Sequence, residues 1–164
     1  LLDGDHHRRA ALIGENLATA VPSEIAPPNF DAPPHAGYFL VALDRAIAVF
    51  DSLGPYPGGA IPFAERRVGP PSRAYLKLWE ACTRLREHPR PGDATLDLGS
   101  CPGGWSWALA ELRTEVLSID GAPLDPAVAS RPEIRFRKGD AFRIAPAEAL
   151  AAFRTPRTKI DWLF

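Results

Sequence analysis

The stretch Thr95–Trp107, TLDLGSCPGGWSW, decides the fold of this chain of 164 residues. It begins within the apolar run Ala94–Leu98, which favours a β-strand, and breaks at Gly99. After two further glycines, apolar residues recur at helical spacing. A strand, a glycine turn and a helix in this order leave free backbone N–H groups at the helix N-terminus, where a ligand can approach the main chain. The sequence therefore predicts a ligand site at this turn.

The spacing of the glycines indicates which ligand the turn binds. Gly99, Gly103 and Gly104 read G-x-x-x-G-G, whereas a dinucleotide-binding turn reads G-x-G-x-x-G. Asp97 precedes the turn, and Asp120 follows the next apolar run at roughly the ~20-residue distance where such folds bind a ribose. An acid before the turn disfavours a pyrophosphate, and S-adenosylmethionine, with its ammonium, sulfonium and adenosine, fits better. Glycine turns followed by an acid also occur in α/β proteins without this function.

The alternation of elements predicts the fold class. We expect strands over residues 94–98, 115–119, 134–138 and 160–164, helices over 104–112 and 146–153, and a loop with Pro123 and Pro126 after the second strand. This order is typical of a doubly wound, mostly parallel α/β sheet of Rossmann type, which binds ligands beyond the carboxyl ends of its strands. Asp97, Asp120 and Asp140 lie at or near those ends.

A helix precedes the glycine turn. Pro71-Ser72 predicts a capped start, and the helix runs to about Glu87 before a proline-rich stop. Its apolar stripe consists of Tyr75, Leu78, Cys82 and Leu85, and the opposite face carries Arg73, Lys77, Glu80 and Arg84. Lys77 is thus predicted to lie outside the core.

The chain is expected to contain three parts. Residues 1–37 comprise a short helix within 5–20 and a proline-rich linker, residues 38–70 a β-hairpin and a loop connection, and residues 71–164 the Rossmann-like domain. The chain ends inside an apolar run and contains no methionine. We therefore expect a fragment whose sheet is truncated in its C-terminal half.

Composition narrows the class of protein. A hydrophobic content of 46% with 24% charged residues is typical of a globular protein, and no apolar run approaches the ~20 residues that span a membrane. We therefore expect a cytoplasmic protein without a membrane partner. Two cysteines and four histidines show no metal-ligand spacing, so neither a metal site nor a disulfide is predicted. The sequence does not indicate an oligomeric state.

The net charge of −1 conceals two basic segments. Residues 66–90 carry seven basic side chains against two acids, and residues 131–159 carry eight against three. These segments flank the glycine turn. They are suited either to contacts with a phosphate backbone or to ordinary solvated faces, and composition does not choose between the two.

Four motifs together resemble the FtsJ-like S-adenosylmethionine-dependent RNA 2′-O-ribose methyltransferases. They are Ser72–Leu78 (SRAYLKL), Asp97–Trp105 (DLGSCPGGW), Ser118–Asp120 (SID) and Gly139–Phe142 (GDAF). The resemblance covers about residues 38–164. It is closest to the bacterial branch that modifies a cytidine of large-subunit ribosomal RNA, whose members carry an N-terminal THUMP-type RNA-binding region. Thirty-seven N-terminal residues are too few for a full region of this kind.

The resemblance implies a role for each matching residue. Gly99 and residues 101–104 would surround the methionine moiety, Asp120 would bind the ribose hydroxyls, and Asp140 the adenine amino group. The complete set of cofactor-binding residues expected in this way is Asp97, Gly99, Ser100, Cys101, Pro102, Gly103, Gly104, Trp105, Asp120, Asp140 and Ala141. Packing against the sheet is the expected role of Trp105 and Trp107, with stacking on a base as the alternative.

Lys77 matches the first lysine of the family's Lys-Asp-Lys-Glu catalytic set. A positioned lysine can accept or steer the proton of a ribose hydroxyl, and Arg73 and Arg84 are expected to hold RNA phosphates. The family's aspartate follows the last strand, so its equivalent would come just after Phe164, and Asp161 does not match it. With one of four catalytic positions, the chain alone is expected to be inactive.

Two other functions remain open from the sequence. A methyltransferase acting on a small molecule or a protein would keep the glycine turn and the acids without needing the basic face around Lys77. A noncatalytic RNA-binding relative would keep the basic segments and lack the catalytic aspartate.

Overall fold

The structure, a computed structural model, describes residues 37–42, 45–49, 61 and 63–164. The chain divides into two compact units, Leu1–Ala64 and Glu65–Phe164. The helix expected within 5–20 and the proline-rich linker of residues 22–34 lie outside the described residues. The three-part division expected from the sequence stays a prediction.

The first unit contains the predicted β-hairpin. Strand β1 (Gly37–Ala42) pairs antiparallel with β2 (Arg45–Val49), with Gly37 opposite Val49. The register shifts between Leu40 and Ala42, close to the turn.

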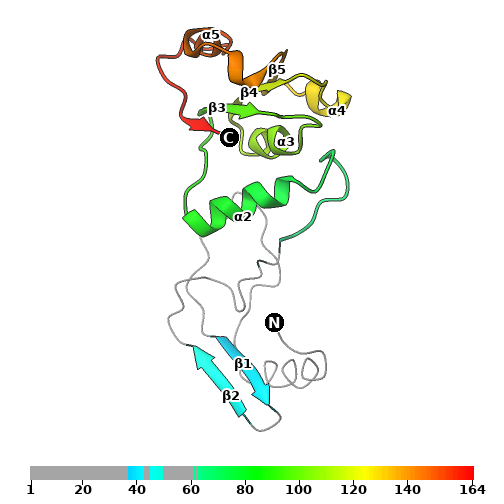
Figure 1. Cartoon of the computed structure of the whole chain (residues 1–164), viewed down its shortest axis with the longest axis vertical. Coiled ribbons are helices and arrows are strands. Elements are labelled where there is room, and N and C mark those ends of the chain that lie inside the picture. The colour runs from blue at the N-terminus through cyan, green and yellow to red at the C-terminus, as the bar shows by residue number, and fades with distance from the viewer. Residues whose placement is uncertain (1–36, 43–44, 50–60, 62) are drawn as a thin grey trace. The chain divides into compact units, whose positions relative to one another are not determined.

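The second unit is built on a four-stranded parallel sheet. Its strands are β3 (Ala94–Leu98), β4 (Glu115–Asp120), β5 (Ile134–Lys138) and β6 (Trp162–Leu163), in the order β5-β4-β3-β6 (Figure 1). The first and last residues of all four strands lie within two residues of the predicted ones. Because they are parallel, their carboxyl ends meet at one edge, and the predicted Rossmann-like α/β class is confirmed.

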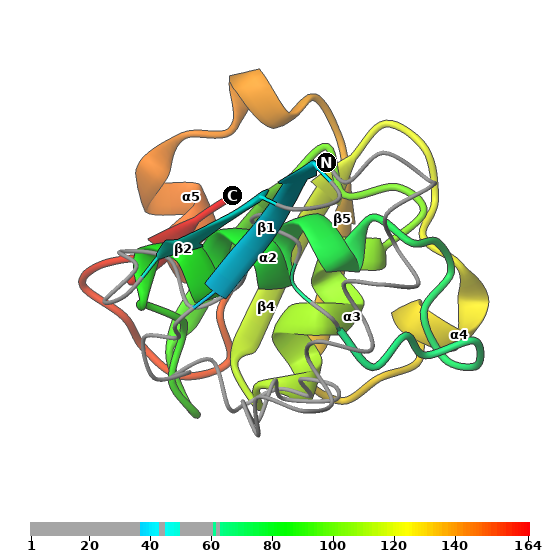
Figure 2. The ribbon, with the colours of Figure 1, turned by 90° about the horizontal axis from the view of Figure 1, so that it is seen from below.

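Helices cover both faces of this sheet. On one face lies α3 (Gly104–Glu111), with α2 (Tyr75–Leu85) packed over it, and on the other lies α5 (Pro146–Ala151) (Figures 1 and 2). Side chains of a strand point alternately to the two faces. The core cluster on the α5 side consists of Ala94, Leu96, Leu117, Ile119, Ala149 and Phe153. Tyr75, Trp79 and Trp107 form an aromatic cluster between α2 and α3, with ring centroids 4.7 to 6.1 Å apart.

Helix α2 differs from its prediction at both ends. The Ser72 hydroxyl accepts a hydrogen bond from Ala74 N–H at 3.3 Å, which closes a turn ahead of the helix, so the helix begins only at Tyr75 and the predicted capped start at Ser72 is wrong. Leu85 is 71% exposed and does not belong to the buried apolar stripe, because it is the last residue of the helix. Trp79 takes its place in the core and is 1% exposed.

The segment predicted as a loop after β4 contains a short helix, α4 (Pro126–Ala129). The Asp125 carboxylate accepts a hydrogen bond from Ala127 N–H at 2.9 Å, and Pro126 occupies the first helical position, where its missing N–H costs nothing. Pro126 therefore begins a helix here and does not mark its absence. A single 3-10 turn, η3 (Ala141–Arg143), follows β5.

Two adjacent glycines allow α3 to begin in close contact with its neighbours. A Cβ at Gly103 would lie 2.9 Å from Val128 Cγ1, and one at Gly104 would lie 2.7 Å from the Ser72 hydroxyl. Gly103 also has a φ of 109°, which L side chains rarely adopt. Protein packing, more than the approach of a ligand, thus requires glycine at these two positions.

We predict that Gly103→Ala destabilises the protein by about 1–3 kcal/mol, because the new methyl group meets Val128 and the backbone is strained. Chemical denaturation measures this difference in the free energy of unfolding. Gly121→Ala is the matched control, since nothing lies within 4 Å of a Cβ at Gly121 and its φ lies outside the strained range. Equal stability of the two variants would contradict the packing role.

Candidate functional site

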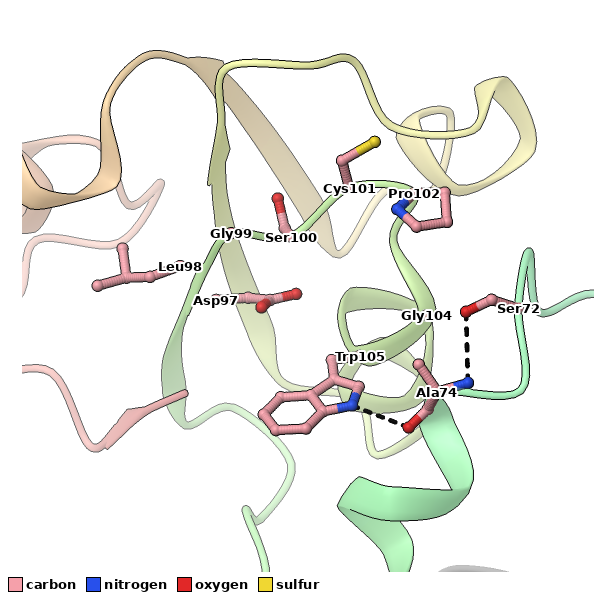
Figure 3. A pocket seen from close by; sticks show the side chains of 10 residues that line it. All are labelled: Ser72, Ala74, Asp97, Leu98, Gly99, Ser100, Cys101, Pro102, Gly104 and Trp105. Carbon is pink, nitrogen blue, oxygen red and sulfur yellow. Dashed lines mark hydrogen bonds between the residues drawn. The ribbon is translucent and has the colours of Figure 1, made fainter.

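A cavity of about 230 Å³ opens at the carboxyl end of β3 (Figure 3). It is formed by the end of this strand, the glycine turn, the first residues of α3 and the turn ahead of α2. Its lining residues are Ser72, Ala74, Asp97, Leu98, Gly99, Ser100, Cys101, Pro102, Gly104 and Trp105. Seven of the eleven predicted cofactor-binding residues therefore lie together around one cavity.

The backbone of the glycine turn is tied to β4. The N–H groups of Gly99 and Ser100 both donate to the Ile119 carbonyl, at 2.9 and 3.4 Å. The N–H of Cys101 donates to the Asp120 carboxylate at 2.9 Å, and Pro102 has no N–H. The expectation of free N–H groups is therefore wrong for residues 99–102. The polar groups that this part of the turn offers a ligand are chiefly side chains and carbonyls.

Asp97 is a buried acid in the wall of the cavity. The residue is 3% exposed, and the hydroxyl of Ser106 donates to its Oδ2 at 2.5 Å. Burial raises the pKa of the Asp97 carboxyl, against the hydrogen bonds from Ser106, and the nearby Asp120 carboxylate raises it further. A carboxylate that has lost its water in this way gains from a positively charged ligand group.

Ser100 presents a buried polar atom to the same cavity. It is 5% exposed, and its hydroxyl has no hydrogen-bond partner among the described residues. A buried hydroxyl without a partner costs about 1–3 kcal/mol, so a ligand that supplies one is favoured.

Asp120 stands at the carboxyl end of β4. Its two oxygens accept hydrogen bonds from Ala122 N–H at 2.8 Å and from Cys101 N–H at 2.9 Å. These bonds, the one from Ala122 first, lower the pKa of this carboxyl and keep it ionised. Asp120 therefore holds the glycine turn in place and carries a negative charge beside it.

One predicted cofactor residue, Asp140, lies at a second cavity, and Ala141 follows it in the chain. Asp140 lines a separate cavity of about 280 Å³ with Ile119, Arg137, Gly139, Arg143 and Ile144. Its carboxylate accepts from Phe142 N–H at 2.9 Å, and Ala141 packs against the core cluster of the α5 side. Ile119 belongs to the strand that carries Asp120, which places this cavity next along the edge of the sheet.

Gly103 is the one predicted cofactor residue of the turn that does not line the cavity, because it faces Val128 and Leu124 of the α4 region. Trp107 is 4% exposed in the aromatic cluster, which agrees with its expected packing role. Trp105 lines the cavity and donates through Nε1 to the Ala74 carbonyl at 2.8 Å (Figure 3).

Lys77 lies one helical turn after Ala74, so both residues are on the same face of α2. Its side chain is exposed, and its N–H donates to the same Ala74 carbonyl that binds Trp105. Lys77 is not among the residues that line the cavity, and its backbone is joined to the cavity wall through the Ala74 carbonyl.

The two predicted RNA-binding arginines are both engaged in ion pairs. Arg73 pairs with Glu65 at 2.7 Å and lies in the turn ahead of α2, and Arg84 pairs with Glu80 at 2.7 Å. The pairs are largely exposed, and such pairs contribute about 0–1 kcal/mol, so phosphates can compete for these guanidinium groups.

Among the described residues, no helix is long and apolar enough to cross a membrane. Within that same part of the chain, no three His, Cys, Asp or Glu side chains come together as a group able to hold a metal ion. The two cysteines, Cys82 and Cys101, are free thiols.

The parallel sheet, the glycine turn and the acids at the strand ends form a ligand-binding arrangement of Rossmann-like fold. Residues 70–163, more than half of the chain, match the FtsJ-like methyltransferase family. The chain belongs to this family.

Curated relatives refine this assignment. The chain is 43% identical to a protein of Halorhodospira halophila named ribosomal RNA large subunit methyltransferase M, over 70% of this chain and 32% of the relative. It is 33% identical to the protein of that name from Methylococcus capsulatus, over 69% and 30% of the two chains. It is 43% identical to the protein of that name from Xylella fastidiosa, over 57% of this chain and 25% of the relative. The chain spans about a third of the length of the first two relatives.

Sequence reasoning missed four residues of the site. Ser72 and Ala74 reach the cavity from the turn ahead of α2, and no spacing rule connects them to the glycine turn. Ser106 and Ser118 lie beneath the cavity, where they support Asp97. The sequence could have indicated Ser106 through its place in the helix, because it is the third residue of the helix that follows the glycine turn.

We predict that Asp97→Asn stabilises the free protein, and does so more at pH 7 than near pH 4. Because the folded-state pKa of Asp97 is raised above its ordinary value of 3.8, the folded state binds this proton more tightly than the unfolded state. The contribution of Asp97 to stability is therefore favourable at low pH and lost as the pH rises through the raised pKa.

Thermal unfolding of both proteins between pH 4 and pH 7 measures this difference. Asp93→Asn, which changes an acid at the opposite end of β3, is the control. A destabilisation by Asp97→Asn that grows toward pH 7 would contradict the assigned direction of the pKa.

Proposed function

We propose that this chain forms the cofactor-binding part of an enzyme that transfers a methyl group from S-adenosylmethionine to a ribose 2′-hydroxyl of large-subunit ribosomal RNA. The observation that carries the proposal is the cavity at the carboxyl end of β3, where a buried acid and a buried unpartnered hydroxyl meet. The family match and the names of the curated relatives support the choice of RNA as acceptor.

The side chains at the site fit S-adenosylmethionine. Asp97 offers a carboxylate to the ammonium group of the methionine part, and the orphaned hydroxyl of Ser100 offers a hydrogen bond to its polar end. Asp120 has free acceptor capacity for the ribose hydroxyls beyond its two backbone bonds. Asp140 and the neighbouring cavity suit the adenine.

When bound, the cofactor supplies an electrophilic methyl group on its sulfonium. The protein must bring a ribose hydroxyl in line with that methyl group, because transfer requires aligned reacting atoms about 3 Å apart. Lys77, one helical turn after the cavity-lining Ala74, holds or accepts the proton of the attacking hydroxyl. Its exposed side chain leaves room for RNA to approach from outside.

The cations near α2 support an RNA acceptor over a small molecule. Arg73 and Arg84 are exposed, and each forms an ion pair at the surface, with Glu65 and Glu80 respectively. A phosphate can replace the Glu65 or Glu80 carboxylate with little loss, because the median surface pair contributes ~0–1 kcal/mol. A small acceptor would need no such exposed cations beside the lysine.

We predict that the full-length protein binds S-adenosylmethionine and that Asp120→Ala weakens this binding by about 10- to 100-fold, the effect of losing a hydrogen bond to a charged group. Calorimetric titration with the cofactor and with S-adenosylhomocysteine measures the affinity. Glu87→Ala, which removes an exposed acid beyond the end of α2, is the control. A folded wild-type protein that binds neither compound would overturn the proposed function.

We further predict that Lys77→Ala lowers the rate of ribose methylation about 10²- to 10⁴-fold in the full-length protein while the affinity for the cofactor is unchanged. Transfer of labelled methyl groups to ribosomal RNA measures the rate. Lys159→Ala is the matched control, since that exposed lysine pairs with Asp161 just before β6, away from the carboxyl ends of the strands. Retained activity of Lys77→Ala would remove Lys77 from the mechanism.

A further inference from the structure

Asp97, Ser106 and Ser118 form a buried polar group directly beneath the cavity. The register of the sheet sets Asp97 on β3 opposite Ser118 on β4, and Ser106 reaches both from the third position of α3. The Ser106 hydroxyl lies 2.5 Å from Asp97 Oδ2 and 2.7 Å from the Ser118 hydroxyl. All three residues are at most 3% exposed. Such burial is unusual for serines unless their hydroxyls are satisfied.

The number of protons fixes the direction of these hydrogen bonds. Each hydroxyl has one proton to donate. When Asp97 is ionised, Ser106 gives its proton to the carboxylate, so its contact with Ser118 then requires Ser118 to be the donor. The two hydroxyls are thus aligned in series toward the carboxylate, and each bond of such a series strengthens the next.

We propose that Ser106 and Ser118 are positioning residues that hold the Asp97 carboxylate ionised at the wall of the cavity, ready for the ammonium group of a ligand. The proposal rests on the proposed function, because it assumes a ligand with an ammonium group in this cavity. Neither serine lines the cavity, so both act through Asp97.

The surroundings of Asp97 oppose its ionisation, so the hydrogen bond from Ser106 matters for its charge. Burial opposes the ionised form of this carboxyl, and Asp120 at the end of β4 adds electrostatic repulsion. Among the described residues that line the cavity, the other titratable side chain is the Cys101 thiol in the turn. The Ser106 bond is the side-chain contact that favours ionisation. Ligand binding therefore releases a proton wherever the free carboxyl is still protonated.

The test measures the affinity for S-adenosylhomocysteine between pH 5 and pH 8 in the full-length protein. For the wild type, affinity should rise with pH until Asp97 is ionised and then level off. The midpoint is the pH at which this rise in affinity is half complete. In Ser106→Ala the midpoint should move upward by about 1–2 pH units, the effect of losing a hydrogen bond to a charged group. Ser118→Ala should move it in the same direction by less, and affinities should converge at the highest pH.

Two controls separate positioning from folding. Thr114→Val removes a buried hydroxyl that contacts Thr95 at the opposite end of β3, and it should leave the midpoint in place. Methylthioadenosine, which lacks the ammonium group, should bind all variants with the same weak dependence on pH.

Loss of affinity by the same factor at every pH would overturn the proposal, because a merely structural role acts uniformly. An unmoved midpoint in both serine variants would overturn it as well. Carbon-13 NMR titration of the Asp97 carboxyl in the ligand-free protein decides the role of the hydroxyls independently: its pKa must rise in Ser106→Ala. Failure of the folded wild type to bind the ligand at any pH would instead refute the proposed function.

Discussion

The structure around the cavity depends on the absence of side chains at two adjacent positions. Gly103 lies against Val128 of α4, and Gly104 lies against the turn that precedes α2. A methyl group at either position would push one of these neighbours away by several tenths of an ångström or more. Because residues 103 and 104 have no side chains, the start of α3 can pack closely against two segments. These are helix α4 and the turn ahead of α2. The ligand cavity is a product of this close packing between protein segments.

Close packing also explains why the site relies on side chains. The turn donates most of its first backbone N–H groups to β4, which fixes its shape and removes those donors from the ligand. The negative charges of Asp97 and Asp120 and the hydroxyl of Ser100 then set the polarity of the site. A turn that bound a phosphate would need the opposite arrangement, with N–H groups free and acids absent. The first part of the turn therefore presents negative charge and no free N–H groups to the cavity.

Sequence reasoning located the strands and most of the lining of the cavity, because both follow from local patterns. The apolar run of β3, the glycine turn and the acid after β4 are each visible in a short window. The reasoning failed where packing between distant segments decides the outcome. Leu85 fits the period of α2 but is its exposed last residue, while Trp79 packs beside Trp107. Ser118 became part of the site only through the register of β3 and β4, which no single segment of sequence encodes.

The carbonyl of Ala74 accepts hydrogen bonds from both Trp105 Nε1 and the N–H of Lys77. One oxygen atom thus belongs at once to the first turn of α2 and to the wall of the cavity. Any sliding of α2 along α3 would carry Lys77 with it and stretch the bond from the indole to Ala74. The position of the Lys77 backbone relative to the cavity wall is therefore fixed to within about the tolerance of a single hydrogen bond, a few tenths of an ångström.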